Sequence, residues 1–269
     1  MNSTGTSPSA MDPSSASTPG SGGRGRLLLV PTPLADVEAT PLAQVLPLGT
    51  LQAAAGLRHW IVENAKTARG FLGALNAVCP LRVPLQQQQL SVLPKHRQLD
   101  AGAARALLAP ALQGFDLGLV SEAGAPCVAD PGAAVVAQAH ELGVRVLPLV
   151  GPSSLLLALM AGGLDGQCFA FHGYLPTAEE PRRKALQTLE RDSAQRRQTQ
   201  MFIETPYRNA ALLHALAHVL RPDTRVSVAC DLTAPQGFVR TRSAAQWRAE
   251  LDRLPPRAPT MFSLLAAHP

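Results

Sequence analysis

The stretch VSEAGAPCVADPGAAVV, residues 120–136, decides the fold because it joins a buried strand to a helix through a turn of small residues. The apolar residues before it predict a strand over 116–120, and Pro131 predicts the first turn of a helix with Asp130 as its N-cap. Gly143 is the expected end of that helix. Because ligands bind beyond the carboxyl ends of the strands in an open parallel sheet, this turn is a candidate binding loop.

The side chains of this turn favour binding over covalent chemistry. The turn contains no histidine or lysine, and no serine in it is placed as a nucleophile. Gly124 allows the main chain to approach a ligand closely, and the start of the helix offers free N–H groups. The nucleotide-binding patterns G-x-x-x-x-G-K-[ST] and G-x-G-x-x-G are both absent. The turn therefore suits a ligand that arrives already activated, and an ordinary tight strand-to-helix turn is the alternative interpretation.

Strand and helix patterns alternate on both sides of this turn. Such alternation is typical of a parallel α/β sheet with right-handed crossovers. The second half repeats the alternation less regularly, and residues 236–253 give only a weak signal. The expected strands lie near residues 26–30, 59–62, 89–94, 116–120 and 144–150, and then near 167–176, 199–206, 224–233 and 259–267.

The composition along the chain predicts its division into parts. Residues 1–25 are rich in Ser, Thr, Pro, Gly and Ala, have almost nothing to bury, and are expected to form a disordered low-complexity tail. The sequence LVGPSS at the end of the first series of strands is the expected seam between two domains, an N-terminal α/β domain over 26–150 and a C-terminal α/β domain over 151–269. The glutamines at 86–89 are interpreted as a solvated loop.

The overall composition argues against several classes of protein. Of the 269 residues, 46% are hydrophobic and only 4% are aromatic, which predicts an aliphatic core. The four cysteines lie far apart and the seven histidines show no metal-ligand spacing, so we expect no metal site, no disulfide framework and a cytoplasmic protein. The one uncharged run of membrane length, 146–164, is interrupted by Pro148, Gly151 and Pro152, so we expect no membrane span.

Charge is distributed unevenly along the chain. The net charge is +5, and residues 152–269 hold 14 basic and 10 acidic side chains, a balance of +4. The helical pattern at 179–197 contributes six basic and four acidic residues to that half. Mixed signs at these spacings are typical of an exposed helix, and contact with RNA is the alternative interpretation. The basic excess permits an anionic partner without requiring one.

Several motifs in a fixed order carry a resemblance to a known family. VSEAGAPCVADPG is followed by PLVGPSSLLLALMAGG, FAFHGYLP and FIETPYRN. From about residue 27 to its end, the chain resembles the tetrapyrrole-methylase superfamily of S-adenosylmethionine (SAM)-dependent methyltransferases. It is similar to the branch that methylates a ribose 2′-hydroxyl of small-subunit ribosomal RNA, and to a little-characterised bacterial group that shares VENAKTAR.

The resemblance implies a fold and a cofactor. The expected fold class is α/β, with two α/β domains, a mainly parallel sheet in the first domain, a mixed sheet in the second, and SAM bound in the cleft between them. A homodimer is also implied. By motif position, the residues implied to contact SAM are Pro33, Glu122, Ala123, Gly124, Ala125, Pro126, Val128, Ser153, Ser154, Tyr174, Leu175, Pro176, Glu204 and Thr233.

The motifs define the residues that bind the methyl acceptor less well than those that contact SAM. Glu63 follows a strand at the expected cleft and is our candidate general base or acceptor ligand, with a helix-start acid favoured by the helix dipole as the alternative. Substrate contacts are expected from Asp36, Lys66, Arg69 and Arg208, although Lys66 and Arg69 also fit a solvated helix face and Arg208 also fits an ion pair with Glu204. The chain has TPLAD, ENAK and SEAGAP where the ribosomal branch usually has TPIGN, EDTR and SDAGTP. These departures preserve the SAM interpretation and leave the acceptor open.

The chemistry of the SAM sulfonium explains why a binding loop with so few reactive side chains is sufficient. Its methyl group is already a good electrophile, so the enzyme's tasks are alignment, exclusion of water, and deprotonation or orientation of the acceptor. We therefore expect a SAM-dependent methyltransferase that acts in ribosomal RNA processing, with a ribose 2′-hydroxyl as the favoured acceptor. A methyltransferase acting on a tetrapyrrole or another small molecule, and a non-catalytic SAM-binding protein, are the alternatives.

Overall fold

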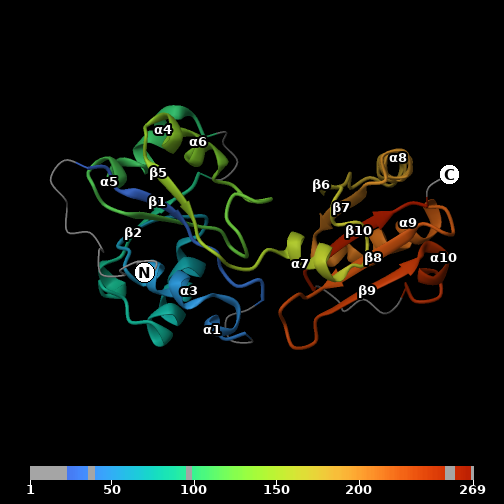
Figure 1. The fold of residues 1–269 in the computed structure, drawn as a ribbon, viewed down its shortest axis with the longest axis horizontal. Coiled ribbons are helices and arrows are strands. Elements are labelled where there is room, and N and C mark those ends of the chain that lie inside the picture. The colour runs from blue at the N-terminus through green and yellow to red at the C-terminus, as the bar shows by residue number, and fades with distance from the viewer. Residues whose placement is uncertain (1–22, 36–39, 95–98, 252–257, 268–269) are drawn as a thin grey trace, which may run out of the picture.

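A computed structural model describes residues 23–35, 40–94, 99–251 and 258–267, which form two lobes, each built on a five-stranded sheet (Figure 1). The first sheet has the strand order β3-β2-β4-β1-β5 and is parallel throughout. The second has the order β6-β7-β10-β8-β9, in which only β6 and β7 pair in parallel. The predicted fold class, with a parallel and a mixed sheet, is confirmed.

Within the described ranges, ten short strands make up the two sheets. Those of the first sheet are β1 (Arg26–Leu29), β2 (His59–Val62), β3 (Gln89–Val92), β4 (Leu117–Val120) and β5 (Arg145–Pro148). Those of the second sheet are β6 (Phe169–Tyr174), β7 (Thr199–Glu204), β8 (Arg225–Cys230), β9 (Phe238–Ser243) and β10 (Thr260–Leu265).

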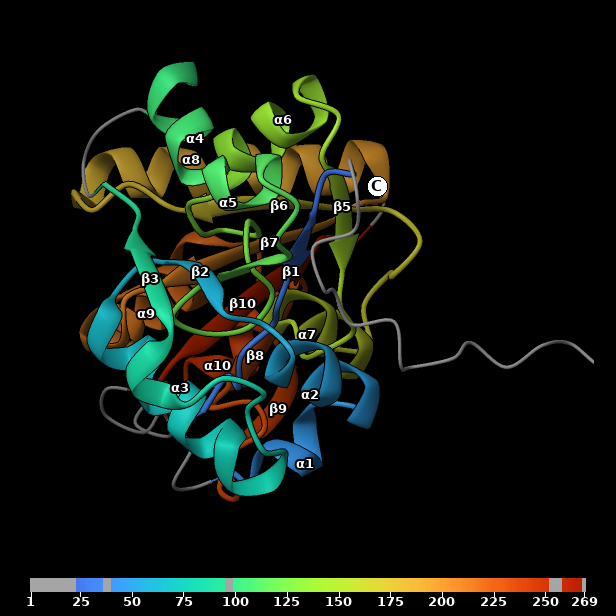
Figure 2. The same cartoon turned by 90° about the vertical axis from the view of Figure 1, so that its left-hand side faces the viewer.

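Helices cover both faces of the first sheet (Figure 2). One apolar cluster joins β1, β2 and β4 to the first group of helices, and it includes the fully buried Trp60 and Leu75. A second cluster on the other face joins the same strands to the second group, through residues such as Ile61 and Val135. The first group is α1 (Leu42–Val45), α2 (Leu48–Ala55) and α3 (Ala65–Val78); the second is α4 (Ala101–Leu107), α5 (Ala109–Leu112) and α6 (Ala133–Glu141).

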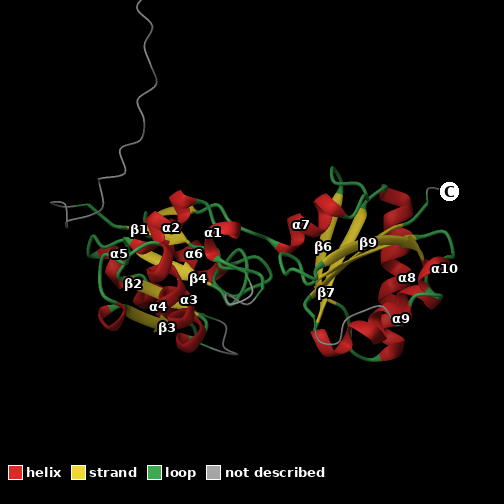
Figure 3. Ribbon diagram, turned by 90° about the horizontal axis from the view of Figure 1, so that it is seen from below, coloured by secondary structure: helices red, strands yellow, loops and turns green. Residues whose placement is uncertain are grey.

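The second sheet is covered unequally. Its main core packs α8 (Glu179–Arg196), α9 (Asn209–Val219) and α10 (Ala244–Trp247) against one face. On the other face a smaller cluster involves α7 (Ser154–Ala161), which lies at the end of this lobe nearer the first (Figure 3). The second lobe therefore directs its thinly covered sheet face toward the first lobe.

The helix after the opening stretch begins later than predicted. Asp130 is not its N-cap, because α6 starts at Ala133 with Gly132 at the cap position and no side-chain cap. Gly132 has a φ of 129°, and a Cβ there would lie 2.8 Å from Cys127 Sγ, so the close approach of this turn requires glycine. The residues between Asp130 and Ala133 therefore continue the turn instead of forming the first turn of the helix. The predicted helix end is confirmed, with Gly143 at a φ of 62°.

The glutamines at 86–89 form secondary structure and one of their side chains is buried, so their interpretation as a solvated loop is wrong. A short 3₁₀ helix (Leu85–Gln87) leads into β3, which starts at Gln89. Gln88 is only 7% exposed, and its Oε1 accepts a hydrogen bond of 2.8 Å from Trp60 Nε1. Its Nε2 donates to the Val83 carbonyl at 2.8 Å. The buried indole N–H needs an acceptor, which Gln88 supplies.

Other expectations fall partly outside the described residues. The predicted tail lies outside them except for residues 23–25, and so does Asp36. The weak region 236–253 contains β9 and α10, neither of which was predicted. Within the described ranges, no helix combines the length and the apolar character that crossing a membrane requires.

The Gln88 contact yields a stability prediction. Gln88→Ala should lower the free energy of unfolding by about 1–3 kcal/mol, because it leaves the buried indole N–H of Trp60 without an acceptor. Urea denaturation followed by tryptophan fluorescence measures the change. Gln86→Ala, at an exposed position two residues earlier, is the matched control and should have little effect. Equal effects of the two substitutions would contradict this role of Gln88.

Candidate functional site

A cleft between the two lobes consists of three adjoining cavities. The large cavity has a volume of about 420 Å³, the medium cavity about 250 Å³ and the small cavity about 40 Å³. Ala123 lines all three, while Leu34, Asp231 and Pro259 line both the large and the medium cavity. These shared walls make the cavities compartments of one cleft.

The first lobe supplies most of the large cavity. Its lining comes from the loops after β1 and β4 and from one face of α3. The residues are Thr32, Pro33, Leu34, Ala35, Thr67, Ala68, Gly70, Phe71, Val120, Ser121, Glu122 and Ala123, together with Asp231 and Pro259 of the second lobe.

The second lobe supplies most of the medium cavity, and both lobes build the small one. The medium cavity is lined by Leu34, Ala123, Ser154, Tyr174, Ile203, Glu204, Pro206, Ala229, Asp231, Leu232, Pro259, Thr260 and Met261. The small cavity is lined by Ala123, Gly124, Ala125, Val128, Ala129, Ser153, Ser154, Leu155, Phe171, Ile203 and Met261.

Two loops of the first lobe are joined at the floor of this cleft. Thr32 N donates to the Gly124 carbonyl at 2.9 Å and Gly124 N donates to the Thr32 carbonyl at 3.1 Å, which forms an antiparallel bridge outside the sheet. Gly124 has a φ of 76°, and a Cβ at this position would lie 2.9 Å from Leu34 Cδ2. The bridge therefore fixes the loop after β4 against the loop after β1, and only glycine fits there without strain.

Backbone strain is concentrated at the cleft. In the described chain, five non-glycine residues have a positive φ, and four of them lie in two loops of the cleft. These are Cys127 and Ala129 after β4, and Asp231 and Thr233 after β8. Residues in this conformation cost of the order of 1–3 kcal/mol each and persist only where the surroundings enforce them, often at functional sites.

The walls of the large and medium cavities are acidic. Glu122 and Asp231 line the large cavity, and Glu204 and Asp231 line the medium one, while no lysine, arginine or histidine is among the described residues that line either. The Glu204 carboxylate is almost fully buried and pairs with Arg208 at 2.8 Å. An uneven charge of this kind favours a ligand that carries positive charge.

Glu63 lies beside the large cavity without lining it. Its Oε1 accepts a hydrogen bond of 3.3 Å from Glu122 N, so it holds the loop after β4. The N-cap of α3 is the next residue, Asn64, which accepts from Lys66 N at 2.9 Å. Lys66 and Arg69 are exposed, while the adjacent face of α3 lines the large cavity.

The predicted cofactor residues mostly converge on the cleft. Those that line a cavity are Pro33, Glu122, Ala123, Gly124, Ala125, Val128, Ser153, Ser154, Tyr174 and Glu204. Pro126 is buried, Leu175 belongs to the core of the second lobe, and Pro176 is exposed. None of these three lines a cavity of the described cleft, and neither does Arg208.

Thr233 connects the lobes rather than lining a cavity. Its carbonyl accepts a hydrogen bond of 3.2 Å from Thr40 Oγ1 of the first lobe. Its own Oγ1 is buried and has no hydrogen-bond partner within the described residues.

Sequence reasoning missed several residues of the cleft. Thr67, Gly70 and Phe71 follow from the helical spacing of α3, once that face is known to turn toward the loops. Pro259 immediately precedes β10 and Met261 lies within it, and this strand runs antiparallel between β7 and β8. Its first residues therefore lie beside the last residues of those strands, and no local pattern reveals that placement.

Cys127 is the one thiol in the binding loop, and its surroundings keep it protonated. Burial, with the negative charges of Asp130 and Glu63, raises the pKa of Cys127 to about 11. Burial also raises the pKa of Asp130, opposed by a hydrogen bond from Ser121. Because the thiolate is the nucleophilic form, Cys127 is a poor nucleophile at neutral pH.

Comparison with known proteins finds several relatives that carry the same name. No family model matches the chain. Proteins called ribosomal RNA small subunit methyltransferase I are 33% identical in Vibrio cholerae (58% of this chain, 54% of the relative), 33% in Synechocystis sp. (78% and 67%) and 32% in Xylella fastidiosa (78% and 69%). The chain thus spans between about half and two thirds of the length of the curated relatives it matches.

Solved structures share the fold at low sequence identity. The methyltransferase CobJ superposes with a TM-score of 0.56 at 17% identity, covering 90% of this chain and 95% of that one. A cobalt precorrin-4 methyltransferase of cobalamin biosynthesis superposes with a TM-score of 0.54 at 11% identity, covering 89% and 94%. These similarities show the tetrapyrrole-methylase fold.

The surroundings of Cys127 predict a pH dependence of alkylation. The thiolate fraction of a thiol with a pKa of about 11 rises about tenfold per pH unit up to that pH, so labelling of Cys127 by iodoacetamide should still be accelerating between pH 9 and pH 10.5. Quantitative peptide mass spectrometry measures the labelling rate. A rate for Cys127 that reaches its plateau near pH 9 would contradict the buried, negatively charged environment.

Proposed function

We propose a SAM-dependent methyltransferase function for this chain, which belongs to the ribosomal RNA small subunit methyltransferase I family. The methyl acceptor that we favour is a ribose 2′-hydroxyl of small-subunit ribosomal RNA. The observation that carries the proposal is the acidic interlobe cleft, whose strained binding loops hold the motifs that resemble this family.

The residues of the medium and small cavities fit SAM. The acidic walls suit its positive charge, and small residues such as Ala123 and Ser154 leave room for it. When bound, SAM supplies a methyl group on a positively charged sulfur, which is already a good electrophile. The chain's own residues then align the reactants and exclude water, tasks that a preorganised cleft performs.

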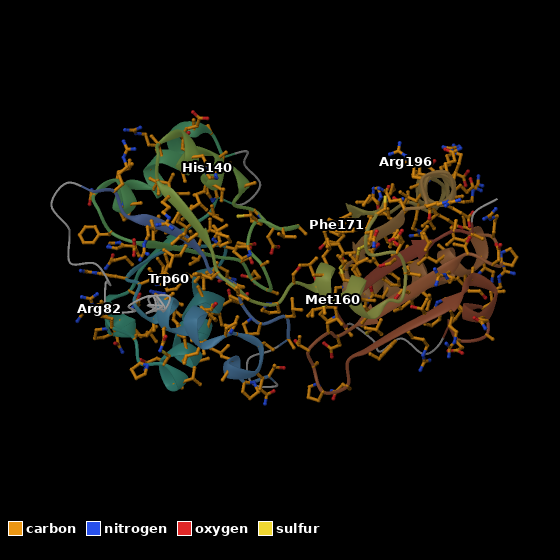
Figure 4. All side chains as sticks on the ribbon, viewed as in Figure 1. Trp60, Arg82, His140, Met160, Phe171 and Arg196 are labelled. Carbon is orange, nitrogen blue, oxygen red and sulfur yellow. The ribbon has the colours of Figure 1, made fainter. Side chains whose placement is uncertain are left out.

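The large cavity is the proposed acceptor side. Its walls include α3 and the loops in which the chain departs from the ribosomal branch, with Glu63 and the exposed Lys66 and Arg69 close by. An RNA acceptor is supported by the names of the relatives and by the basic excess of the second half, to which α8 contributes residues such as the labelled Arg196 (Figure 4). The activity would then take place in the cytoplasm, which the four free cysteines suit.

Two alternatives lead to different observations. A tetrapyrrole or other small acceptor would enter the large cavity as a whole and bind with little dependence on salt, whereas RNA affinity falls steeply as salt rises. A non-catalytic SAM-binding protein would bind the cofactor without forming any methylated product.

A homodimer through α7 is the assembly that we propose. Although seven of the eight residues of SLLLALMA are apolar, Ala158 is the only one of them that is buried. Met160 is 79% exposed and lies with Phe171 at the end of the second lobe nearer the first (Figure 4). Nearby β6 is an edge strand of its sheet, and its first residue, Phe169, is also exposed. An exposed apolar surface beside a free strand edge favours burial against a second copy of the chain.

The proposed activity has a direct assay. Small ribosomal subunits from a strain lacking this protein should incorporate labelled methyl from SAM into a ribose of their RNA, as identified by nucleoside mass spectrometry. Ala123→Phe should lower SAM affinity and methyl incorporation at least about tenfold by filling the cleft, while Ala134→Phe, on the exposed face of α6, should change neither. Bound SAM without any labelled RNA would overturn the proposed acceptor.

The assembly is tested by a charge on α7. Met160→Glu places a carboxylate on the exposed apolar surface and should shift the protein from the mass of two chains to that of one, because burying an unpaired charge is costly. Multi-angle light scattering measures the mass. Ala137→Glu, on the exposed face of α6, is the control and should remain dimeric. A monomeric parent protein would contradict the proposed dimer.

A further inference from the structure

We propose that Asp231 is the base that accepts the proton of the acceptor hydroxyl, an inference that rests on the proposed function. Asp231 follows the last residue of β8 and lines both the large and the medium cavity. Among the residues that the structure describes, Leu34, Ala123 and Pro259 also line both cavities, and none of these has an ionisable side chain. Asp231 therefore lies at the boundary between the proposed acceptor compartment and the proposed SAM compartment, where the two reactants meet.

The backbone of Asp231 is held firmly on several sides. Its N–H donates to the Pro259 carbonyl at 2.8 Å, and its carbonyl accepts from Ala234 N at 3.0 Å. Gly237 packs so closely that a Cβ there would lie 2.1 Å from the Asp231 carbonyl oxygen. The φ of 51° is the strained conformation that this packing enforces. Such a fixed backbone places the side chain with the precision that proton transfer requires.

The other carboxylates of the cleft already have partners. Glu122 lines only the large cavity and accepts a hydrogen bond of 2.8 Å from the Thr67 hydroxyl. Glu204 pairs with Arg208 and accepts from Thr205 N at 2.7 Å. Glu63 accepts from the Glu122 amide and lines neither cavity, so we assign it the role of a positioning residue for the loop after β4.

Asp231 differs from these carboxylates because its side chain is not engaged by another described residue. Within the part of the chain that the structure describes, its carboxylate has no hydrogen bond and no ion pair. A carboxylate without a partner at the junction of two compartments can accept a proton from a substrate hydroxyl, which general base catalysis requires.

The proposed step conserves atoms and charge. Asp231 takes the proton of the acceptor hydroxyl as the acceptor oxygen forms its bond to the methyl carbon. The bond from that carbon to sulfur breaks, and its electron pair stays on sulfur, which becomes a neutral thioether. Asp231 afterwards loses the proton to water, so the products are the methyl ether, S-adenosylhomocysteine and a proton.

The test separates proton transfer from cofactor binding. Asp231→Asn should fold normally, because asparagine tolerates a positive φ and no hydrogen bond of the carboxylate is lost. We expect its single-turnover rate on small ribosomal subunits with labelled SAM to fall about 100-fold or more. Its calorimetric affinity for S-adenosylhomocysteine, which is neutral at sulfur, should stay within about twofold of the parent protein, and its affinity for SAM should fall far less than the rate does. Asp223→Asn, an exposed carboxylate outside the cleft, should leave rate and affinities unchanged.

Several outcomes would overturn the inference. Asp231→Asn at the parental rate would show that no base is needed there, and a loss of SAM affinity as large as the expected loss of rate would make Asp231 a ligand of the sulfonium instead. Asp231→Glu keeps the carboxylate and should recover part of the rate, so equal losses in both variants would indicate a structural role. If the parent protein binds SAM and methylates RNA, these results concern Asp231 alone; if it does neither, the proposed function fails first.

Discussion

The antiparallel bridge between Thr32 and Gly124 is the constraint on which the cleft depends. Two hydrogen bonds join the loops after β1 and β4, although the strands themselves run parallel. The loop after β4 must then turn through left-handed residues before α6 can begin. This path turns main-chain groups and small side chains toward the second lobe, so the loop can bind a ligand without reactive groups of its own.

The second lobe completes the site by bringing charge to that loop. β10 runs antiparallel between β7 and β8, so the start of one strand and the ends of two meet opposite the first lobe. Glu204 and Asp231 lie at those ends, but the first is neutralised by Arg208 while the second has no partner in the described structure. The division of tasks between the lobes follows: one shapes the binding loop, and the other supplies the charge that the proposed chemistry uses.

The sequence predicted the parts of this arrangement that local patterns encode. Alternating strands and helices gave the fold class, and motif order indicated the family to which the relatives belong. Local patterns misplaced the start of α6, because Asp130 and Pro131 look like a helix start while close packing around Gly132 delays it. They also missed Gln88, whose role depends on an indole 28 residues away, and the Asp231 junction, which depends on the order of strands in the second sheet.

The central claim is that both lobes bind SAM at once, and hydrogen–deuterium exchange with and without S-adenosylhomocysteine tests it most directly. The product is neutral at sulfur and unreactive, so it reports binding alone. Protection should increase together in the loop after β4, at the start of α7 and in the loop after β8, which line the same cleft. Protection confined to one lobe, or no change at saturating ligand, would contradict the account.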